Sequence, residues 1–101
     1  MKFERTPQFD ADLKRLSANE YKEFRSVAKE EFSLACDRRS ANPSEPWPTR
    51  LRVKSVQGTE RILEMTWAWP NGRATFEWVS VEGERRVRWR RIGGHEIFKK
   101  P

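Results

Sequence analysis

Residues 85–98 read RRVRWRRIGGHEIF, and this stretch decides how the rest of the chain is interpreted. Side chains alternate between the two faces of an extended strand, so Arg86, Arg88 and Arg90 share one face. Val87 and Trp89 fall on the other. The stretch therefore predicts a strand in a sheet that buries aromatic residues on one side and presents arginines on the other. Such a surface suits a polyanion.

The excess positive charge of the chain lies entirely in its second half. Residues 1–48 hold nine Lys/Arg and nine Asp/Glu, whereas residues 49–101 hold twelve Lys/Arg and six Glu. The length predicts one domain, 1–101. The sequence lacks an apolar leader and any run of about 18 apolar residues, so we expect a cytoplasmic protein without a membrane partner. Cys36 is the single cysteine, which excludes an intrachain disulfide and a cysteine zinc cluster.

The first half predicts a short strand followed by a helical hairpin. Residues 2–6 read as a strand, and Thr6-Pro7 is a helix start for a segment running to Leu16. The capping box of residues 17–20 starts a second helix that we expect to end near Asp37. Its predicted buried stripe comprises Tyr21, Phe24, Val27, Ala28, Phe32 and Ala35.

The second half predicts four strands separated by turns, at 51–56, 61–69, 73–81 and 85–92. Asn71-Gly72 is a strong signal for a tight hairpin. The expected core face of these strands comprises Leu51, Val53, Leu63, Met65, Trp67, Trp69, Ala74, Phe76, Trp78, Val87 and Trp89. The opposite, basic face comprises Arg52, Lys54, Glu64, Thr66, Arg73, Thr75, Glu77, Arg86, Arg88 and Arg90. Of the five tryptophans, Trp47 in a proline-rich loop is the expected exception to burial.

The order β-α-α-β-β-β defines an α+β fold, with a helical hairpin packed on one face of a small, mostly antiparallel sheet. This order, residues 6–16, the segments 56–58 and 62–65, residues 71–76 and the closing residues 91–98 together resemble the RelE/ParE toxin superfamily of bacterial toxin–antitoxin systems. RelE-like members cut messenger RNA, usually on the ribosome, and ParE-like members poison DNA gyrase. The resemblance implies these activities and a cognate antitoxin protein as partner.

RNA cleavage without a metal needs a base for the 2′-hydroxyl, an acid for the leaving oxygen and cations around the phosphorane. His95 titrates nearest neutrality and is the candidate for proton transfer, with Glu64 as a second candidate. Guanidinium groups suit phosphate oxygens, so Arg73, Arg88 and Arg90 complete the predicted catalytic set. The predicted RNA-binding residues are Arg52, Lys54, Arg86 and, as a stacking platform, Phe98. We expect neither a metal nor a cofactor.

Two alternatives to a ribosome-associated mRNA endonuclease stay open. One is a gyrase-inhibiting toxin of the same fold, which a longer second helix would favour. The other is a nucleic-acid-binding homologue without catalysis, because Thr66 and Phe98 stand where many family members carry arginine and tyrosine. Each residue also has a plainer interpretation: the arginines as a solvated face, His95 as a polar turn residue, and Glu77 as a cross-strand ion-pair partner.

Overall fold

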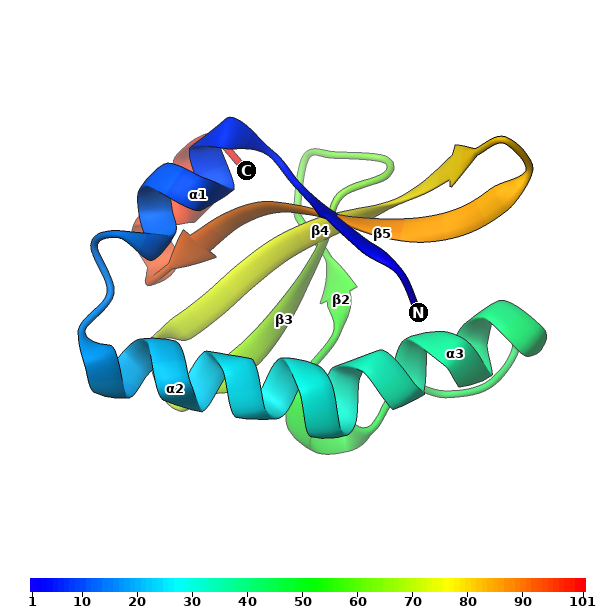
Figure 1. Cartoon of the computed structure of the whole chain (residues 1–101), viewed down its shortest axis with the longest axis horizontal. Helices are drawn as coiled ribbons and strands as arrows, with labels where there is room; N and C mark the ends of the chain where they lie inside the picture. Colours follow the sequence, from blue (N-terminus) through cyan, green and yellow to red (C-terminus); the bar gives the residue numbers. More distant parts are fainter.

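A five-stranded sheet in the order β1-β5-β4-β3-β2 forms the centre of the molecule (Figure 1). The computed structural model describes all residues from Met1 to Pro101. The strands are β1 (Phe3–Arg5), β2 (Lys54–Ser55), β3 (Leu63–Ala68), β4 (Gly72–Val81) and β5 (Glu84–Gly93). Only the β1–β5 pair is parallel, so the expected α+β fold with a mostly antiparallel sheet is confirmed.

The helices cover one face of this sheet. They are α1 (Pro7–Leu13), α2 (Ala18–Val27), the π-helical turn η1 (Ala28–Phe32) and α3 (Ser33–Ala41). The last three form one continuous rod (Figure 1). None of the helices is both long and apolar enough to cross a membrane.

Local capping signals place the helix starts where the sequence predicts them. The Thr6 hydroxyl accepts a hydrogen bond from the Phe9 amide at 3.1 Å. Ser17 and Glu20 form the reciprocal capping box, at 3.1 and 2.8 Å. The predicted end near Asp37 is wrong, because the rod continues to Ala41 and ends only at Asn42, which is extended.

The core is an aromatic cluster between the rod and the sheet. Phe32 on the rod packs edge-on against Phe76 of β4, with ring centroids 4.9 Å apart. Its ring is tilted by 38° relative to that of Trp89 of β5, at the same centroid distance. Trp47 stacks on Phe32 at 5.9 Å, so the expectation that Trp47 stands apart from the core is wrong. Burial of each of these rings stabilises the folded state by about 2–3 kcal/mol relative to a ring exposed to water.

Two predictions at strand ends are also wrong. The predicted strand 51–56 is reduced to β2, because residues Thr49–Leu51 form the 3-10 helix η2 and Arg52 follows with φ of 49° in the left-handed region. Leu51 is nevertheless buried, as expected. Trp69 is 66 % exposed instead of buried, because β3 ends at Ala68 and its register with β4 shifts after Thr66.

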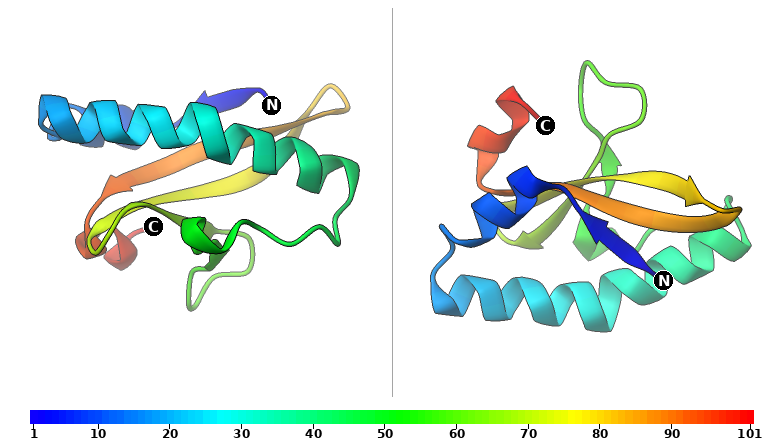
Figure 2. Two further views of the ribbon diagram at one scale, coloured as in Figure 1. Left: turned by 90° about the horizontal axis from the view of Figure 1, so that it is seen from below. Right: turned by 45° about the horizontal axis from the view of Figure 1, so that its top comes forward.

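The sheet face opposite the helices is partly covered. Figure 2 shows the loop before β3 and the C-terminal 3-10 helix η3 (His95–Lys99) on that side of the sheet. The backbone oxygen of Pro101 accepts hydrogen bonds from Thr75 Oγ1 at 3.2 Å and from Arg90 Nε at 3.0 Å. Thr75 is therefore completely buried on the face that the sequence predicts to be open.

Candidate functional site

A cleft of about 640 Å³ lies on this partly covered face. Four chain segments build it: β2 with the turn that follows, β3, β4 and η3. Its lining residues are Lys54, Ser55, Val56, Gln57, Glu64, Arg73, His95 and Phe98. Five of these eight were predicted as site residues from the sequence, and the structure brings those five together.

Glu64 and Lys54 face one another across the β2–β3 ladder. They are paired in register, and Lys54 Nζ lies 3.9 Å from Glu64 Oε1. The Glu64 carboxylate is nearly buried, whereas the Lys54 side chain is mostly exposed. The contact is long for a charge-assisted hydrogen bond, so both groups keep capacity for a ligand.

Arg73 is held in the floor of the cleft without a carboxylate partner at salt-bridge distance. It is 8 % exposed, and its Nη1 donates to the backbone oxygen of Gly72 at 3.2 Å. Burial lowers the pKa of the Arg73 guanidinium; the charge of Glu64 opposes this shift and that of Arg52 adds to it. An arginine stays protonated despite such a shift. Arg73 is therefore a partly desolvated cation that forms no salt bridge, although the charge of Glu64 acts on it.

His95 and Phe98 enter the cleft from η3, where their rings stack with centroids 6.0 Å apart. The Glu96 carboxylate closes the turn before them by accepting from the Gly94 amide at 3.0 Å. A Cβ on Gly94 would lie 2.6 Å from Glu96 Oε2, so a larger residue there would displace this carboxylate. The buried side chain of Ile97 anchors the segment between the two rings. The imidazole itself is exposed.

The arginine row of β5 lies outside the cleft. Arg86, Arg88 and Arg90 do point away from the core, as the alternation predicts, but carboxylates pair with each of them. Arg86 contacts Glu84 at 2.8 Å and Glu4 at 3.6 Å. Arg88 contacts Glu4 at 3.2 Å, and Arg90 contacts Glu77 at 2.6 Å, which is the pairing expected for Glu77. The open row of free cations expected from the sequence is thus largely neutralised.

Arg52 also lies outside the cleft, beside its floor. Its guanidinium carbon sits 4.2 Å from the ring centroid of Trp69, and that of Arg73 sits 5.6 Å from the same centroid. Sequence reasoning missed Ser55 and Gln57, which reach the cleft because a turn follows β2. It also missed Trp69, although the Pro70-Asn71-Gly72 turn directly after it marks a strand end.

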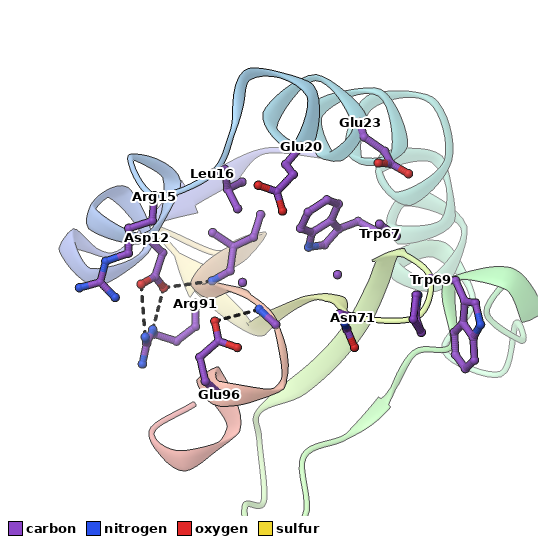
Figure 3. Close-up of a pocket in the computed structure, with 16 residues that line it drawn as sticks. Asp12, Arg15, Leu16, Glu20, Glu23, Trp67, Trp69, Asn71, Arg91 and Glu96 are labelled. Atoms are coloured by element: carbon purple, nitrogen blue, oxygen red, sulfur yellow. Dashed lines mark hydrogen bonds and ion pairs between the residues drawn. The ribbon is translucent and has the colours of Figure 1, made fainter.

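A second pocket, of about 370 Å³, opens at the other side of the β3–β4 turn, between that turn and the helices (Figure 3). Its charged lining is mostly acidic: Asp12, Glu20, Glu23 and Glu96, with Arg15 and Arg91. Arg91 is already paired with Asp12 at 2.7 Å. Such a lining repels a phosphate chain, so the cleft around His95 is the candidate site. Nowhere do three histidine, cysteine or carboxylate side chains gather in a way suited to a metal ion.

Comparison with solved structures identifies the fold. No protein-family model and no curated protein matches the chain. It is similar to the YoeB/ParE toxin from Agrobacterium tumefaciens, with a TM-score of 0.60 and 11% identity over 94% of this chain and 99% of that one. It is also similar to the E. coli DinJ-YafQ complex, with a TM-score of 0.56 and 17% identity over 94% and 93% of the two chains. The chain thus has the fold of RelE/ParE-superfamily toxins, as the resemblance implies.

Proposed function

We propose that this chain is a RelE-like toxin, a metal-independent endoribonuclease that cleaves messenger RNA on the ribosome in the cytoplasm. The supporting observation is the single cleft that gathers an imidazole, a carboxylate, a buried guanidinium, an ammonium group and a stacked aromatic ring. These groups come from segments as distant in sequence as Lys54 and Phe98.

The proposed reaction is attack of a 2′-hydroxyl on the adjacent phosphate. A base takes the 2′-hydroxyl proton while the 2′-oxygen bonds to phosphorus, and the P–O5′ bond breaks as an acid protonates the 5′-oxygen. The products are a 2′,3′-cyclic phosphate and a 5′-hydroxyl end. DNA lacks the nucleophile, so the site is specific for RNA by its chemistry.

The cleft residues divide between proton transfer and charge stabilisation. His95 moves protons, and Glu64 is the second titratable group in reach of the same space. Arg73 and Lys54 stabilise the phosphorane, and the partly desolvated Arg73 acts more strongly than it would in water. Phe98 stacks a base next to the scissile phosphate.

The paired arginines outside the cleft have a more distant role. Arg86, Arg88 and Arg90 contact the RNA backbone only where phosphates compete with Glu4, Glu84 and Glu77. Their effect on affinity is therefore smaller than that of Arg52, which forms no salt bridge.

The proposed protein partner is a cognate antitoxin that blocks the cleft or its surroundings. One of the similar structures is itself a complex of two proteins, DinJ and YafQ. The net charge of +6 suits both an acidic antitoxin segment and ribosomal RNA, and it makes association rates depend on salt.

A gyrase-directed toxin is the second candidate, and two observations favour it. The helical rod extends to Ala41, beyond the predicted end, and the arginine row is ion-paired. The cleft favours the nuclease, because a gyrase inhibitor has no need of an imidazole, a carboxylate and an unpaired guanidinium around one cavity. Pulse labelling after induction separates the two: the nuclease halts protein synthesis first, and the gyrase inhibitor halts DNA synthesis first.

The direct test is cleavage of a message bound to purified ribosomes, mapped by primer extension. We expect 2′,3′-cyclic phosphate ends, cleavage in the presence of EDTA, and no cleavage when the nucleotide at the mapped site carries a 2′-O-methyl group. His95→Ala should slow cleavage about 10²–10⁴-fold. Glu64→Gln should slow it as well.

The matched control is Glu82→Gln, the same substitution on an exposed carboxylate in the turn between β4 and β5. It should leave cleavage unchanged. Undiminished cleavage by the His95→Ala variant, or by wild type on the 2′-O-methyl message, would contradict the proposed chemistry.

A further inference from the structure

Arginines without a carboxylate partner lie at two places on or beside the sheet: Arg85 at the far end of β5, 4.2 Å from the ring centroid of Trp78, and Arg52 with Arg73 beside the cleft. On β5, arginines 86, 88, 90 and 91 all have carboxylate partners. Arg52 and Arg73 have none at salt-bridge distance, and both guanidinium groups lie over the same indole, that of Trp69. The site therefore combines unpaired cations with an aromatic ring.

Trp69 is unusual among the aromatic residues in its exposure. It is 66 % exposed, compared with 5 % for Trp67 and 4 % for Trp89. Figure 3 shows the Trp67 ring inside the acidic pocket, below the helices, and Trp69 at the outer edge near the β3–β4 turn. An exposed indole does not contribute the free energy that its burial would give, so the stability of the fold does not explain the position of Trp69.

Arg52 reaches the indole from a backbone conformation that arginine rarely adopts. Its φ of 49° and ψ of 43° are left-handed, at the end of η2. Non-glycine residues in this region cost about 1 kcal/mol or more and cluster at ligand sites. The strained residue and the exposed ring thus belong to one surface.

We infer that Trp69 is a stacking platform for a base of single-stranded RNA, next to the nucleotide held in the cleft. This inference rests on the proposed nuclease function. Arg73 connects the two places, because it lines the cleft with His95 and also lies 5.6 Å from the Trp69 ring centroid. The base stacks on the indole, Arg52 contacts the phosphate of the stacked nucleotide, and the phosphate between that nucleotide and the cleft lies against Arg73.

The test measures the binding of a short, labelled, 2′-O-methyl RNA by fluorescence anisotropy, free and on programmed ribosomes, at fixed salt. Trp69→Ala should raise the Kd about 5- to 150-fold, the range that loss of one base–aromatic stack produces. Trp69→Phe should restore part of the affinity. Tyr21→Ala, which removes another exposed aromatic side chain (41 % exposed) on α2, should leave the Kd unchanged.

Two further measurements separate stacking from charge and from a general loss of structure. The slope of log K against log salt should stay the same in Trp69→Ala and fall by about 0.7 in Arg52→Ala, because only the latter removes a phosphate contact. A series of RNAs each carries one abasic nucleotide, at successive positions. Wild type should bind one RNA of this series as weakly as the Trp69→Ala variant binds the intact RNA. On that RNA the Trp69→Ala change should have no further effect.

The outcomes distinguish this inference from the proposed function. Wild-type binding and cleavage with an unchanged Kd in Trp69→Ala would overturn the stacking site and leave the nuclease standing. Additive effects of Trp69→Ala and every abasic position would also overturn it. Failure of wild type to bind the message both free and on the ribosome would overturn the site and the nuclease together.

Discussion

Arg91 of β5 donates two hydrogen bonds to the Asp12 carboxylate of α1, from Nε at 2.7 Å and from Nη2 at 3.2 Å. The same carboxylate accepts from the Ile92 amide at 3.1 Å and from Gln8 at 3.3 Å. Asp12 is 3 % exposed, so this is a buried, fully hydrogen-bonded ion pair. It fixes the first helix to the strand that leads into the His95 turn.

Asp12→Asn should destabilise the protein strongly. The change leaves the Arg91 guanidinium without its counter-ion and replaces a carboxylate oxygen by an N–H donor opposite other donors. Breaking a buried pair by removing one partner costs about 3–5 kcal/mol. Urea denaturation measures this loss. The control is Asp10→Asn, which removes the exposed pair with Arg5 and should cost at most about 1 kcal/mol. Equal effects of the two substitutions would contradict the role of the buried pair.

The same carboxylate predicts how stability depends on pH. Burial alone would raise the pKa of Asp12, but the hydrogen bonds from Arg91, the Ile92 amide and Gln8 together bring it below its ordinary value. A carboxylate with a lowered folded-state pKa contributes stability that is complete above its unfolded pKa and is lost as the pH falls through the folded one. The gap in unfolding free energy between wild type and Asp12→Asn should stay constant from pH 7 to about 5 and shrink below about pH 4. If the difference in unfolding free energy between the two proteins increased as the pH fell, folding would raise the pKa of Asp12 instead of lowering it.

The Cys36 thiol should be inert in the folded protein. It is completely buried in the core, and burial, with a contribution from the Asp37 charge, raises its pKa to about 12. The thiolate is the reactive form, so a disulfide reagent should modify Cys36 only when the structure opens. An added exposed thiol, Ala11→Cys, provides the reference: one thiol should react at once and the second at the rate of opening. Immediate reaction of Cys36 in wild type would contradict its burial.

Periodicity and capping predict most of the interior of each element, because those signals are local. The prediction that Tyr21 belongs to the buried helix stripe is wrong, since its side chain is 41 % exposed on α2. Alternation correctly buries Met65, Phe76, Val87 and Trp89. It fails for Trp69, since alternation ends where the strand ends, and only the β3–β4 register determines that position. It also cannot anticipate the left-handed conformation of Arg52, which shortens the predicted strand.

The cleft was predictable in its members but not in its surroundings. The resemblance and the chemistry indicated His95, Glu64, Arg73, Lys54 and Phe98, which the fold brings together. No sequence pattern shows that Glu4 pairs with Arg88, because the two residues lie 84 positions apart and meet only through the parallel β1–β5 pairing. Charge patterns along one strand therefore overestimate the charge that remains free in the folded molecule.

Arg88 and Arg90, equivalent in the sequence, should behave differently in the folded protein. Arg88 makes only a half-exposed pair with Glu4, whereas Arg90 also donates to the Pro101 oxygen and so holds down the segment that carries His95 and Phe98. Arg88→Ala should leave cleavage close to wild type, with a change in stability of at most about 1 kcal/mol.

Arg90→Ala should lower kcat through loss of His95 positioning, because a small displacement of a catalytic group can cost about 10²-fold. Amide hydrogen exchange tests this positioning role, because a change in RNA binding alone would not alter it. The Ile97 amide donates to the Gly94 oxygen and the Lys100 amide to the Ile97 oxygen. Both amides should lose protection in Arg90→Ala and keep it in Arg88→Ala. Arg90→Lys retains the charge but only one of its two hydrogen bonds, so it should restore RNA affinity more than kcat. If Arg88→Ala and Arg90→Ala changed KM alike and left kcat and exchange intact, both residues would act only as distant phosphate contacts.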